Sequence, residues 1–320
     1  MFLSIGLIAC GFVLLLFGAD FFVRGAVAIA SRLKVPTLII GLTIVALGTS
    51  LPELLVSIKA AINGNVGISL GNVLGSNIAN ILLVLGLSAL IYPIAVKKSA
   101  FLLDFAFLFC TTLIFASFCL TGELIKWHGW VLLLILFWFM FYNYYMAKRD
   151  KGSADSDIPD NLVDKNWFFI LLATLAGLAG IIYGSDFLVR GTVQLAKLCK
   201  ISQEIIGVTI IAVGTSVPEL ATSCVAAYRH QNGIALGNVM GSNIWNIVFI
   251  MGLTASMSNI KVSEQFFGFD LWVMLASTAL LLPLLLYKDK LRRSEGAFMV
   301  CCYALYLYAQ YQFVIGAWHF

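Results

Sequence analysis

Apolar stretches of about 20 residues recur along the whole length of the 320-residue chain. A helix of this length crosses a hydrocarbon core roughly 30 Å thick and bonds its own backbone groups inside lipid. Only 11% of the residues are charged, which excludes a water-soluble fold. The sequence therefore predicts an all-α polytopic membrane protein with ten transmembrane helices. The expected spans are residues 2–30, 36–62, 68–92, 100–120, 127–147, 166–197, 203–228, 234–257, 266–287 and 296–316.

The 20 Lys and Arg residues are distributed unevenly between the two sides that ten alternating spans define. One side receives fourteen, namely Arg24, Arg32, Lys34, Lys97, Lys98, Lys148, Arg149, Lys151, Lys165, Arg229, Lys288, Lys290, Arg292 and Arg293. The other receives Lys59, Lys126, Arg190, Lys197, Lys200 and Lys261. Because basic residues stay cytoplasmic during insertion, we expect both termini outside and the polar stretch 148–165 in the cytoplasm. The net charge of +4 says less than this distribution, and membrane lipids rather than nucleic acid are the expected partners.

Two sequence blocks occur twice, each time 166 residues apart. Residues 41–55 read GLTIVALGTSLPELL and residues 207–221 read GVTIIAVGTSVPELA; residues 71–82 read GNVLGSNIANIL and residues 237–248 read GNVMGSNIWNIV. Each predicted half, 1–147 and 166–320, has an odd number of spans, so the second copy enters the membrane from the opposite side. We therefore expect two inverted five-helix repeats joined by the linker 148–165. In secondary transporters with this symmetry, ion sites lie near the midplane in helices interrupted by Gly or Pro.

Glu53 and Glu219 are repeated acidic residues that lie well inside apolar stretches. Placing an ionised side chain at the bilayer centre is unfavourable by about 2.5 to 3.5 kcal/mol, so such residues mark ion or proton pathways by default. The alternative interpretation is a protonated or snorkelling carboxyl group near a helix end. We favour an ion site.

Pro52 and Pro218 precede the two glutamates and lack a backbone N–H. The carbonyls of Gly48 and Gly214 are therefore expected to lose their helical partners, although an ordinary proline kink would do the same. On the same stretch, each glutamate is preceded by hydroxyl residues close to its own helical face. These hydroxyl residues are Thr49, Ser50, Thr215 and Ser216.

The spans 68–92 and 234–257 carry further polar residues at helical spacing. Ser76 and Asn80 are four residues apart, as are Ser242 and Asn246, so each pair projects from one face and can meet the glutamates. We favour ligation of a cation for these four. The alternative, hydrogen bonding and close packing between helices, is favoured for Asn72, Asn77, Asn238 and Asn243.

All candidate ligands offer oxygen atoms, with no His, Cys or Met among them. Soft metals are disfavoured, and the hard cations calcium, sodium and magnesium remain. Calcium takes about six to eight oxygens in flexible geometry, whereas magnesium demands a tighter octahedron. The pattern favours calcium, and no cofactor is expected beyond the transported ions.

Asp20 with Arg24, and Asp186 with Arg190, are acidic and basic residues four positions apart. Each pair lies toward the end of a predicted span. We interpret both as local ion pairs at the membrane boundary, each contributing little.

At the GTSxPE and GNVxGSN blocks the sequence resembles the cation/calcium antiporter superfamily, specifically compact prokaryotic sodium/calcium exchangers. The paired blocks look like the alpha-repeats of that superfamily, at about 36–92 and 203–257. The resemblance implies a central bundle of the four spans that carry these blocks, across which the spans 2–30 and 166–197 slide. It also implies a monomer in a prokaryotic inner membrane.

For individual residues, the resemblance implies that Glu53 and Glu219 are the principal calcium ligands, with the backbone carbonyls of Thr49 and Thr215 nearby. It implies sodium sites at the hydroxyls or carbonyls of Ala46, Ser50, Ser76, Ala212, Ser216 and Ser242. Many members have Asp where this chain has Asn246, which matches Asn80. This departure argues against a proton or potassium dependence tied to that carboxylate.

The resemblance implies exchange of three sodium ions for each calcium ion, and the two carboxylates then predict electrogenic transport. Proton-coupled calcium export is the alternative within transport. A cation channel fits an inverted repeat with a buried site less well, since this arrangement suits alternating access. An enzyme is not expected, because no buried nucleophile with a base, and no set of softer metal ligands, occurs in the sequence.

Overall fold

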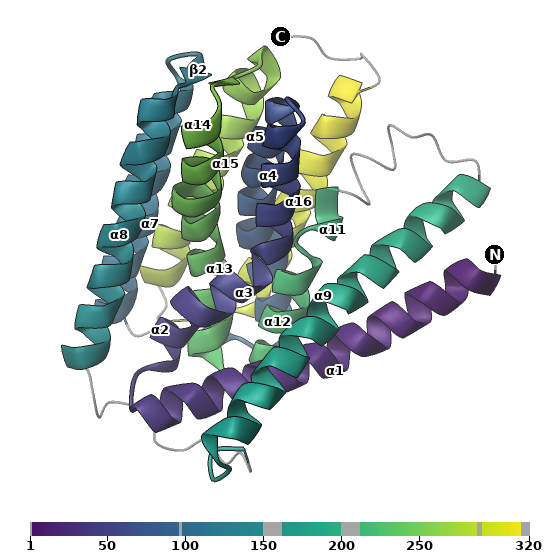
Figure 1. The fold of residues 1–320 in the computed structure, drawn as a ribbon, viewed down its shortest axis with the longest axis vertical. Coiled ribbons are helices and arrows are strands. Elements are labelled where there is room, and N and C mark those ends of the chain that lie inside the picture. The colour runs from purple at the N-terminus through teal and green to yellow at the C-terminus, as the bar shows by residue number, and fades with distance from the viewer. Residues whose placement is uncertain (1, 96–97, 150–161, 200–211, 287–289, 315–320) are drawn as a thin grey trace.

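The computed structural model describes residues 2–95, 98–149, 162–199, 212–286 and 290–314, and these fold almost entirely into helices (Figure 1). Seven helical segments of the described residues are long and apolar enough to cross a membrane, or eight when one bent pair is counted as a span. The prediction of a helical membrane protein is confirmed, and the number ten stays a prediction. The first part of the seventh predicted span, 203–211, lies outside the described residues. Most of the linker also lies outside them, as do four of the basic residues, Lys97, Lys151, Lys200 and Lys288.

The helices of residues 1–149 are α1 (Phe2–Leu33), α2 (Thr37–Ile40), α3 (Ala46–Thr49), α4 (Leu51–Ile62), α5 (Val66–Ala79), α6 (Gly86–Ile91), α7 (Lys98–Cys119) and α8 (Lys126–Arg149). Those after the linker are α9 (Trp167–Leu198), α11 (Ala212–Gly214), α12 (Val217–Tyr228), α13 (Asn232–Trp245), α14 (Gly252–Met257), α15 (Leu271–Leu286) and α16 (Arg293–Val314). Wider π-helical turns interrupt them at η1 (Gly41–Val45), η2 (Asn80–Leu85), η4 (Asn246–Met251) and η5 (Phe266–Asp270).

Two helical runs are broken at the residue before the repeated Leu-Pro or Val-Pro pair. Ser50 leaves the helical conformation between α3 and α4, with φ −84° and ψ 5°, and the two parts are bent by 47°. Ser216 does the same between α11 and α12, with φ −87° and ψ 6°. Proline fits the first turn of a helix, where its missing N–H is not needed. Each break therefore starts a new helix just before a glutamate.

The carbonyls of Gly48 and Gly214, which the prolines leave without their usual helical partner, are bonded by other donors. A backbone N–H at the end of α3 bonds the carbonyl of Gly48. The hydroxyl of Ser185, on α9, donates to the carbonyl of Gly214 at 3.2 Å. Each carbonyl gains a different donor because the break lets the chain tighten or lets a neighbouring helix approach.

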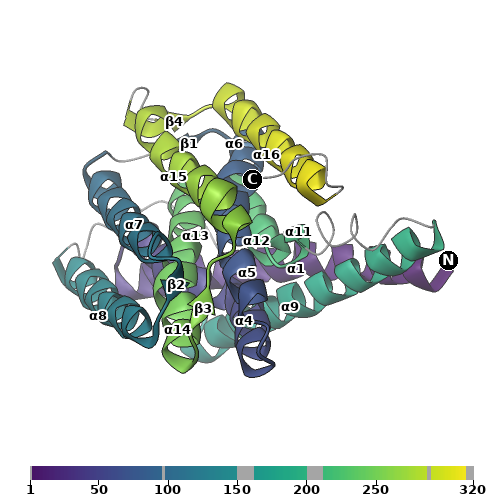
Figure 2. The same ribbon diagram turned by 90° about the horizontal axis from the view of Figure 1, so that it is seen from above.

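The long helices α1 and α9 lie side by side and run antiparallel (Figures 1 and 2). Close approaches fall on glycines: Gly11 lies against Gly184, and Gly25 lies against Thr174. A Cβ atom added at Gly177 would stand 2.5 Å from the backbone nitrogen of Phe22. Small residues allow such backbone contact between helices in a membrane. The two helices therefore pack as one unit.

Asp20 has a partner that the local interpretation missed. Its carboxylate lies 4.0 Å from Arg24, as the spacing predicts, but it also accepts a hydrogen bond from the guanidinium of Arg229, at the end of α12. Sequence spacing cannot show a partner 209 residues away, which the fold brings beside α1. Asp186 and Arg190 form the predicted local pair at 2.7 Å.

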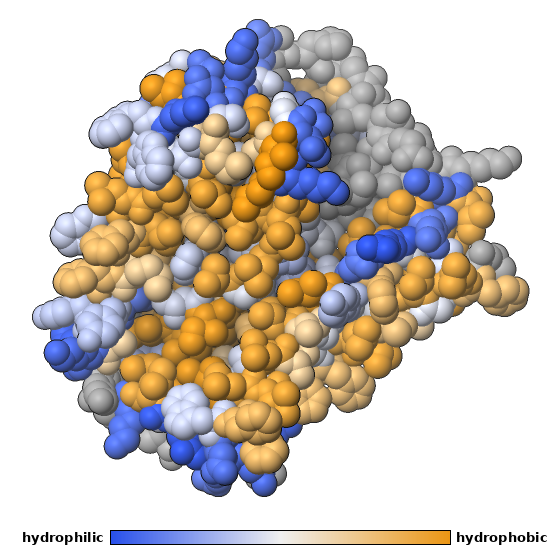
Figure 3. Space-filling view, in the orientation of Figure 1, coloured by the Kyte–Doolittle hydropathy of each residue, from blue (hydrophilic) through white to orange (hydrophobic). Residues whose placement is uncertain are grey.

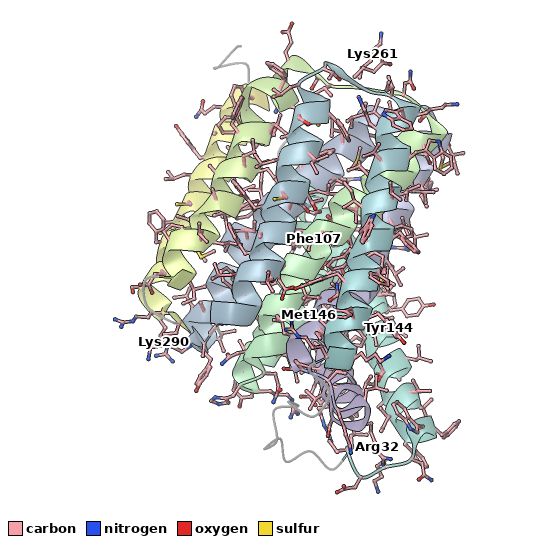
Figure 4. The ribbon with its side chains drawn as sticks, turned by 90° about the vertical axis from the view of Figure 1, so that its left-hand side faces the viewer. Arg32, Phe107, Tyr144, Met146, Lys261 and Lys290 are labelled. Atoms are coloured by element: carbon pink, nitrogen blue, oxygen red, sulfur yellow. The ribbon has the colours of Figure 1, made fainter. Side chains whose placement is uncertain are left out.

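Two short strand pairs, not expected from the sequence, join the ends of the helices. β1 (Ile94–Ala95) pairs antiparallel with β4 (Lys290–Leu291), and β2 (Glu123–Leu124) pairs with β3 (Ile260–Lys261). Lys261 and Lys290 lie at opposite ends of the molecule (Figure 4). At each end, a segment before the linker is thus paired with one after it.

The face of the molecule seen in Figure 3 carries a broad apolar region, with hydrophilic residues gathered above and below it. On α8, large aromatic side chains are exposed near both ends of the helix, including Trp127, Trp130, Tyr144 and Tyr145. Exposed aromatic residues at the two membrane interfaces are typical of spanning helices. The chain is an integral membrane protein.

The glycine contacts between α1 and α9 generate a prediction, with a control glycine on α1 that lies outside the contact. Gly177→Ala is expected to destabilise the protein by about 1–3 kcal/mol, because the added methyl group clashes with the backbone of α1. Gly6→Ala is expected to be neutral or to stabilise by up to about 1 kcal/mol, since nothing described lies within 4 Å of its Cβ position. Thermal unfolding in detergent measures both. Equal melting temperatures for the two variants would contradict the packing described.

Candidate cation site

Two carboxylates lie at the centre of the molecule, one from each side of the linker. Glu53 is in the first turn of α4 and Glu219 is in the first turn of α12, and both side chains are fully buried. The N-terminal end of a helix carries partial positive charge, which favours a carboxylate there. The carboxylates are close enough to interact electrostatically. The breaks at Ser50 and Ser216 thus place two like charges where they need compensation.

The protein satisfies the two carboxylates unequally. One oxygen of Glu219 accepts a hydrogen bond from the Ser50 hydroxyl at 3.1 Å and lies 3.4 Å from the Ser242 hydroxyl. The other oxygen of Glu219, and both oxygens of Glu53, have no hydrogen-bond partner among the described residues. Three carboxylate oxygens therefore remain open to a positively charged ligand such as a metal cation.

Hydroxyl and carbonyl oxygens predicted as ligands gather beside Glu219. The Thr49 hydroxyl lies 3.3 Å from the Ala46 carbonyl and 3.4 Å from the Ser242 hydroxyl. The Ser242 hydroxyl lies 3.5 Å from the Ala46 carbonyl. These contacts are possible because Gly241 packs directly on Leu42 and Ala46.

The corresponding residues on the other side are also brought together. The hydroxyls of Ser76 and Thr215 lie 3.4 Å apart. Ser216 is buried, and its hydroxyl has no partner within the described part of the chain. Ala212 begins α11, and its backbone alone is described.

Asn80 and Asn246 begin the π-helical turns η2 and η4, at positions 166 residues apart. Each donates its side-chain N–H to another asparagine at 3.0 Å, Asn80 to Asn243 and Asn246 to Asn77. Their side-chain oxygens are buried and have no partner among the residues described. π-helical turns widen a helix and often occur at functional sites.

Asn72 and Asn238 connect helices, as the packing interpretation predicts. Asn72 donates to the Glu53 carbonyl at 3.2 Å and to the Ser57 hydroxyl at 3.0 Å. Asn238 makes the same two bonds, to the Glu219 carbonyl at 3.3 Å and the Ser223 hydroxyl at 2.8 Å. Sequence reasoning missed the two serines, although their common position four residues after each glutamate was available as a signal.

Trp245 is another supporting residue that the sequence did not reveal. Its indole N–H donates to the carbonyl of Leu42, inside η1, at 3.1 Å. A π-helical turn leaves carbonyls poorly satisfied, and this bond ties η1 to α13. No spacing rule in the sequence connects two residues so far apart.

The buried oxygens without a described partner define the chemistry of the site. Those at the candidate site are both oxygens of Glu53, one of Glu219, the side-chain oxygens of Asn80 and Asn246, and the hydroxyl of Ser216. An unsatisfied buried polar group is unfavourable by about 1–3 kcal/mol, and more when charged. The two carboxylates and neutral oxygens match the ligands of a hard cation such as calcium.

Comparison with known proteins gives consistent results. Residues 3–145 and 169–312 match the family described as sodium/calcium exchanger protein. The chain is 38% identical over 307 residues to the putative antiporter CaxA of Alkalimonas amylolytica, covering 93% of this chain and 95% of that protein. It is 31% identical over 333 residues to the sodium/calcium exchanger MaX1 of Methanosarcina acetivorans, covering 93% and 95%. The fold is similar to that of the sodium-calcium exchanger NCX_Mj, with TM-score 0.81, 34% identity and coverage of 95% and 97%.

The unpaired carboxylate oxygens generate a prediction about binding. Calcium at about 100 times its dissociation constant should stabilise the purified protein by about 2.7 kcal/mol, because only the folded site holds it. Glu53→Gln and Glu219→Gln are expected to lose this stabilisation, since each removes one of two buried charges. Glu264→Gln, at an exposed position, also removes one negative charge, but this variant should still be stabilised by calcium. Thermal unfolding with and without calcium measures the effect, and full stabilisation of either buried variant would exclude this site.

Proposed function

The chain belongs to the sodium/calcium exchanger protein family, and from this premise we propose that it is a secondary antiporter that exchanges calcium for sodium by alternating access. One observation carries the proposal beyond the family. Buried oxygens without described partners surround two carboxylates that come from opposite sides of the linker. Such a site is suited to a cation, and its proposed ligands come from both halves of the chain.

We propose that the chain is organised as ten spans in two inverted five-helix repeats, 1–147 and 166–320, joined by the linker 148–165. The breaks at Ser50 and Ser216 support this organisation, as do the π-helical turns at Asn80 and Asn246, because members of each pair are 166 residues apart. The strand pairs β1–β4 and β2–β3 support it as well, since each joins the two halves at one end. The blocks 36–92 and 203–257 then supply the site.

The ligand roles follow from charge and position. We propose that calcium binds between Glu53 and Glu219, with the side-chain oxygens of Asn80 and Asn246 completing the shell and the carbonyls of Thr49 and Thr215 nearby. Sodium would bind the hydroxyl or carbonyl oxygens around the two glutamates, because an ion with one positive charge needs fewer carboxylate ligands than calcium does. These oxygens belong to Ala46, Ser50, Ser76, Ala212, Ser216 and Ser242.

Access to the site is proposed to alternate because, among the described residues, one side of the bundle is packed more closely than the other. On one side α13 is buried along its length, and a Cβ atom at Gly237 would stand 2.6 Å from the carbonyl of Leu38, on α2. The positions 166 residues earlier on α5, Gly71 and Gly75, are half-buried, and the segment that corresponds to α2, 203–206, lies outside the described part of the chain. The α2 end lies beside the linker, since Arg32 donates to the carbonyls of Val163 and Lys165. We propose that the site is closed toward the cytoplasm here, and that movement of α1 and α9 reverses the closure.

Counting charges favours electrogenic exchange. The two glutamates carry two negative charges, and Asn80 and Asn246 carry none, so one calcium ion neutralises the site. Three sodium ions would leave one positive charge, and moving it across 100 mV is worth about 2.3 kcal/mol. Two sodium ions or two protons would leave none. We propose that three sodium ions are exchanged for each calcium ion, and proton coupling is the alternative.

Voltage distinguishes these stoichiometries in reconstituted vesicles. With a sodium gradient and a potassium diffusion potential set by an ionophore, calcium flux is expected to rise when the side that sodium leaves is made positive. The control is the Glu53→Gln variant in the same vesicles, which should show no flux. Calcium flux that ignores voltage would exclude three sodium ions, and flux that follows a pH gradient without sodium would favour the proton-coupled alternative.

The orientation in the membrane is tested by labelling single introduced cysteines with an impermeant thiol reagent in intact cells. Thr121→Cys, at the end of α7, is expected to react from outside, because this loop follows an even number of proposed spans. Asp164→Cys, next to α9, is expected to be protected until the cells are opened. Both positions are exposed in the structure. Equal labelling of the two in intact cells would contradict the proposed topology.

A further inference from the structure

We propose that Asn77 and Asn243, which lie outside the proposed ligand set, are positioning residues that orient Asn246 and Asn80 across the two halves of the molecule. This inference rests on the proposed function and names a part of the site that the ligand set does not contain. Asn77 is on α5 and Asn243 is on α13, and both are buried.

Each positioning residue contacts the ligand residue of the other half. The side-chain N–H of Asn246 donates to the side-chain oxygen of Asn77 at 3.0 Å. The side-chain N–H of Asn80 donates to the side-chain oxygen of Asn243, also at 3.0 Å. Asn77 and Asn80 are three residues apart on one helical run, yet the bonds link Asn77 to η4 and Asn80 to α13. The four amides thus form a crossed network between the halves.

The network fixes the direction of each amide. The side-chain N–H of Asn77 donates to the backbone carbonyl of Asn243 at 3.4 Å, and that of Asn243 donates to the backbone carbonyl of Asn77 at 3.1 Å. Turning the Asn77 amide over would set its oxygen against the Asn243 carbonyl and its N–H against the N–H of Asn246. Two bonds would be lost together, and burial leaves no bulk water to replace them.

The direction matters because an amide has a negative and a positive end. With its N–H held by Asn77, Asn246 keeps its side-chain oxygen free of described partners, and Asn80 does the same through Asn243. A cation requires the oxygen end, and the N–H end would repel it. Asn77 and Asn243 therefore prepare two neutral ligands before the ion arrives, which lowers the reorganisation that binding requires.

The crossed pattern gives a test that a general structural role would not satisfy. Half-saturating calcium concentration and maximal rate are measured in sodium-loaded vesicles for Asn77→Ala, Asn246→Ala and the double variant. Asn77→Ala is expected to raise the half-saturating concentration about tenfold, as the loss of one orienting buried hydrogen bond implies, with a smaller change in maximal rate. In the Asn246→Ala background, the same substitution should add less than about twofold, because there is no amide left to orient.

The matched control uses the residue on the same helix. Asn77→Ala combined with Asn80→Ala should show the full effect of both substitutions, since these two side chains share no described bond. The other half supplies an independent copy of the cycle with Asn243→Ala and Asn80→Ala. If Asn77→Ala does not insert, Asn77→Ser, whose hydroxyl is too short to reach Asn246, replaces it, and melting temperatures without calcium identify variants that are merely unstable.

Each outcome decides one point. Coupling between Asn77 and Asn246 without coupling between Asn77 and Asn80 supports the inference. Equal effects of Asn77→Ala in the presence and absence of Asn246 would overturn it and leave calcium transport intact. If Asn80→Ala and Asn246→Ala leave the half-saturating calcium concentration unchanged, these two residues are not ligands, and the inference fails with them. Absence of calcium transport in the unsubstituted protein would overturn the proposed function itself.

Discussion

The structure depends on the compensation of two carboxylates buried in a membrane protein. Each is unfavourable by about 2.5 to 3.5 kcal/mol if ionised at the bilayer centre, and their mutual repulsion adds to this. The chain meets the demand in part, by starting a helix just before each glutamate and by directing Ser50 and Ser242 at Glu219. The remaining oxygens have no described hydrogen-bond donor. We infer that a bound cation supplies the missing positive charge, and that the broken helices exist to hold it.

Close packing through glycine determines which parts of the molecule stay together. The antiparallel pair α1 and α9 is held by backbone contacts along its length, and α13 is held as tightly against α2 and η1. The first contact joins two helices of the proposed moving unit, whereas the second lies inside the bundle that carries the site. Asp20 and Arg229 connect the two parts at one end through an ion pair. A partly exposed ion pair contributes little to stability, so it would offer little resistance to a sliding movement of α1 and α9.

The residues of the candidate site could be proposed from the sequence, whereas the connections around them could not. Glu53, Ser76 and Asn80 stand out because polar residues in apolar spans are unfavourable, and a second copy 166 residues later repeats them. The partner of Asp20, the donor to the Gly214 carbonyl and the strand pairs were not predictable, because each joins residues that no local spacing relates. The direction of the Asn80 amide depends on Asn243, in the other half, so it required the fold. The number of spans and the inverted arrangement remain predictions.

Anomalous X-ray scattering from crystals soaked in calcium or strontium tests the central claim most directly, because it locates the ion without assuming a function. The account predicts one strong divalent peak between Glu53 and Glu219, with carboxylate oxygens of both residues about 2.3–2.6 Å from calcium and the side-chain oxygens of Asn80 and Asn246 facing the ion. Sodium at high concentration should displace the peak. A divalent ion bound away from both glutamates, or bound with the amide N–H groups of Asn80 and Asn246 facing it, would contradict the account.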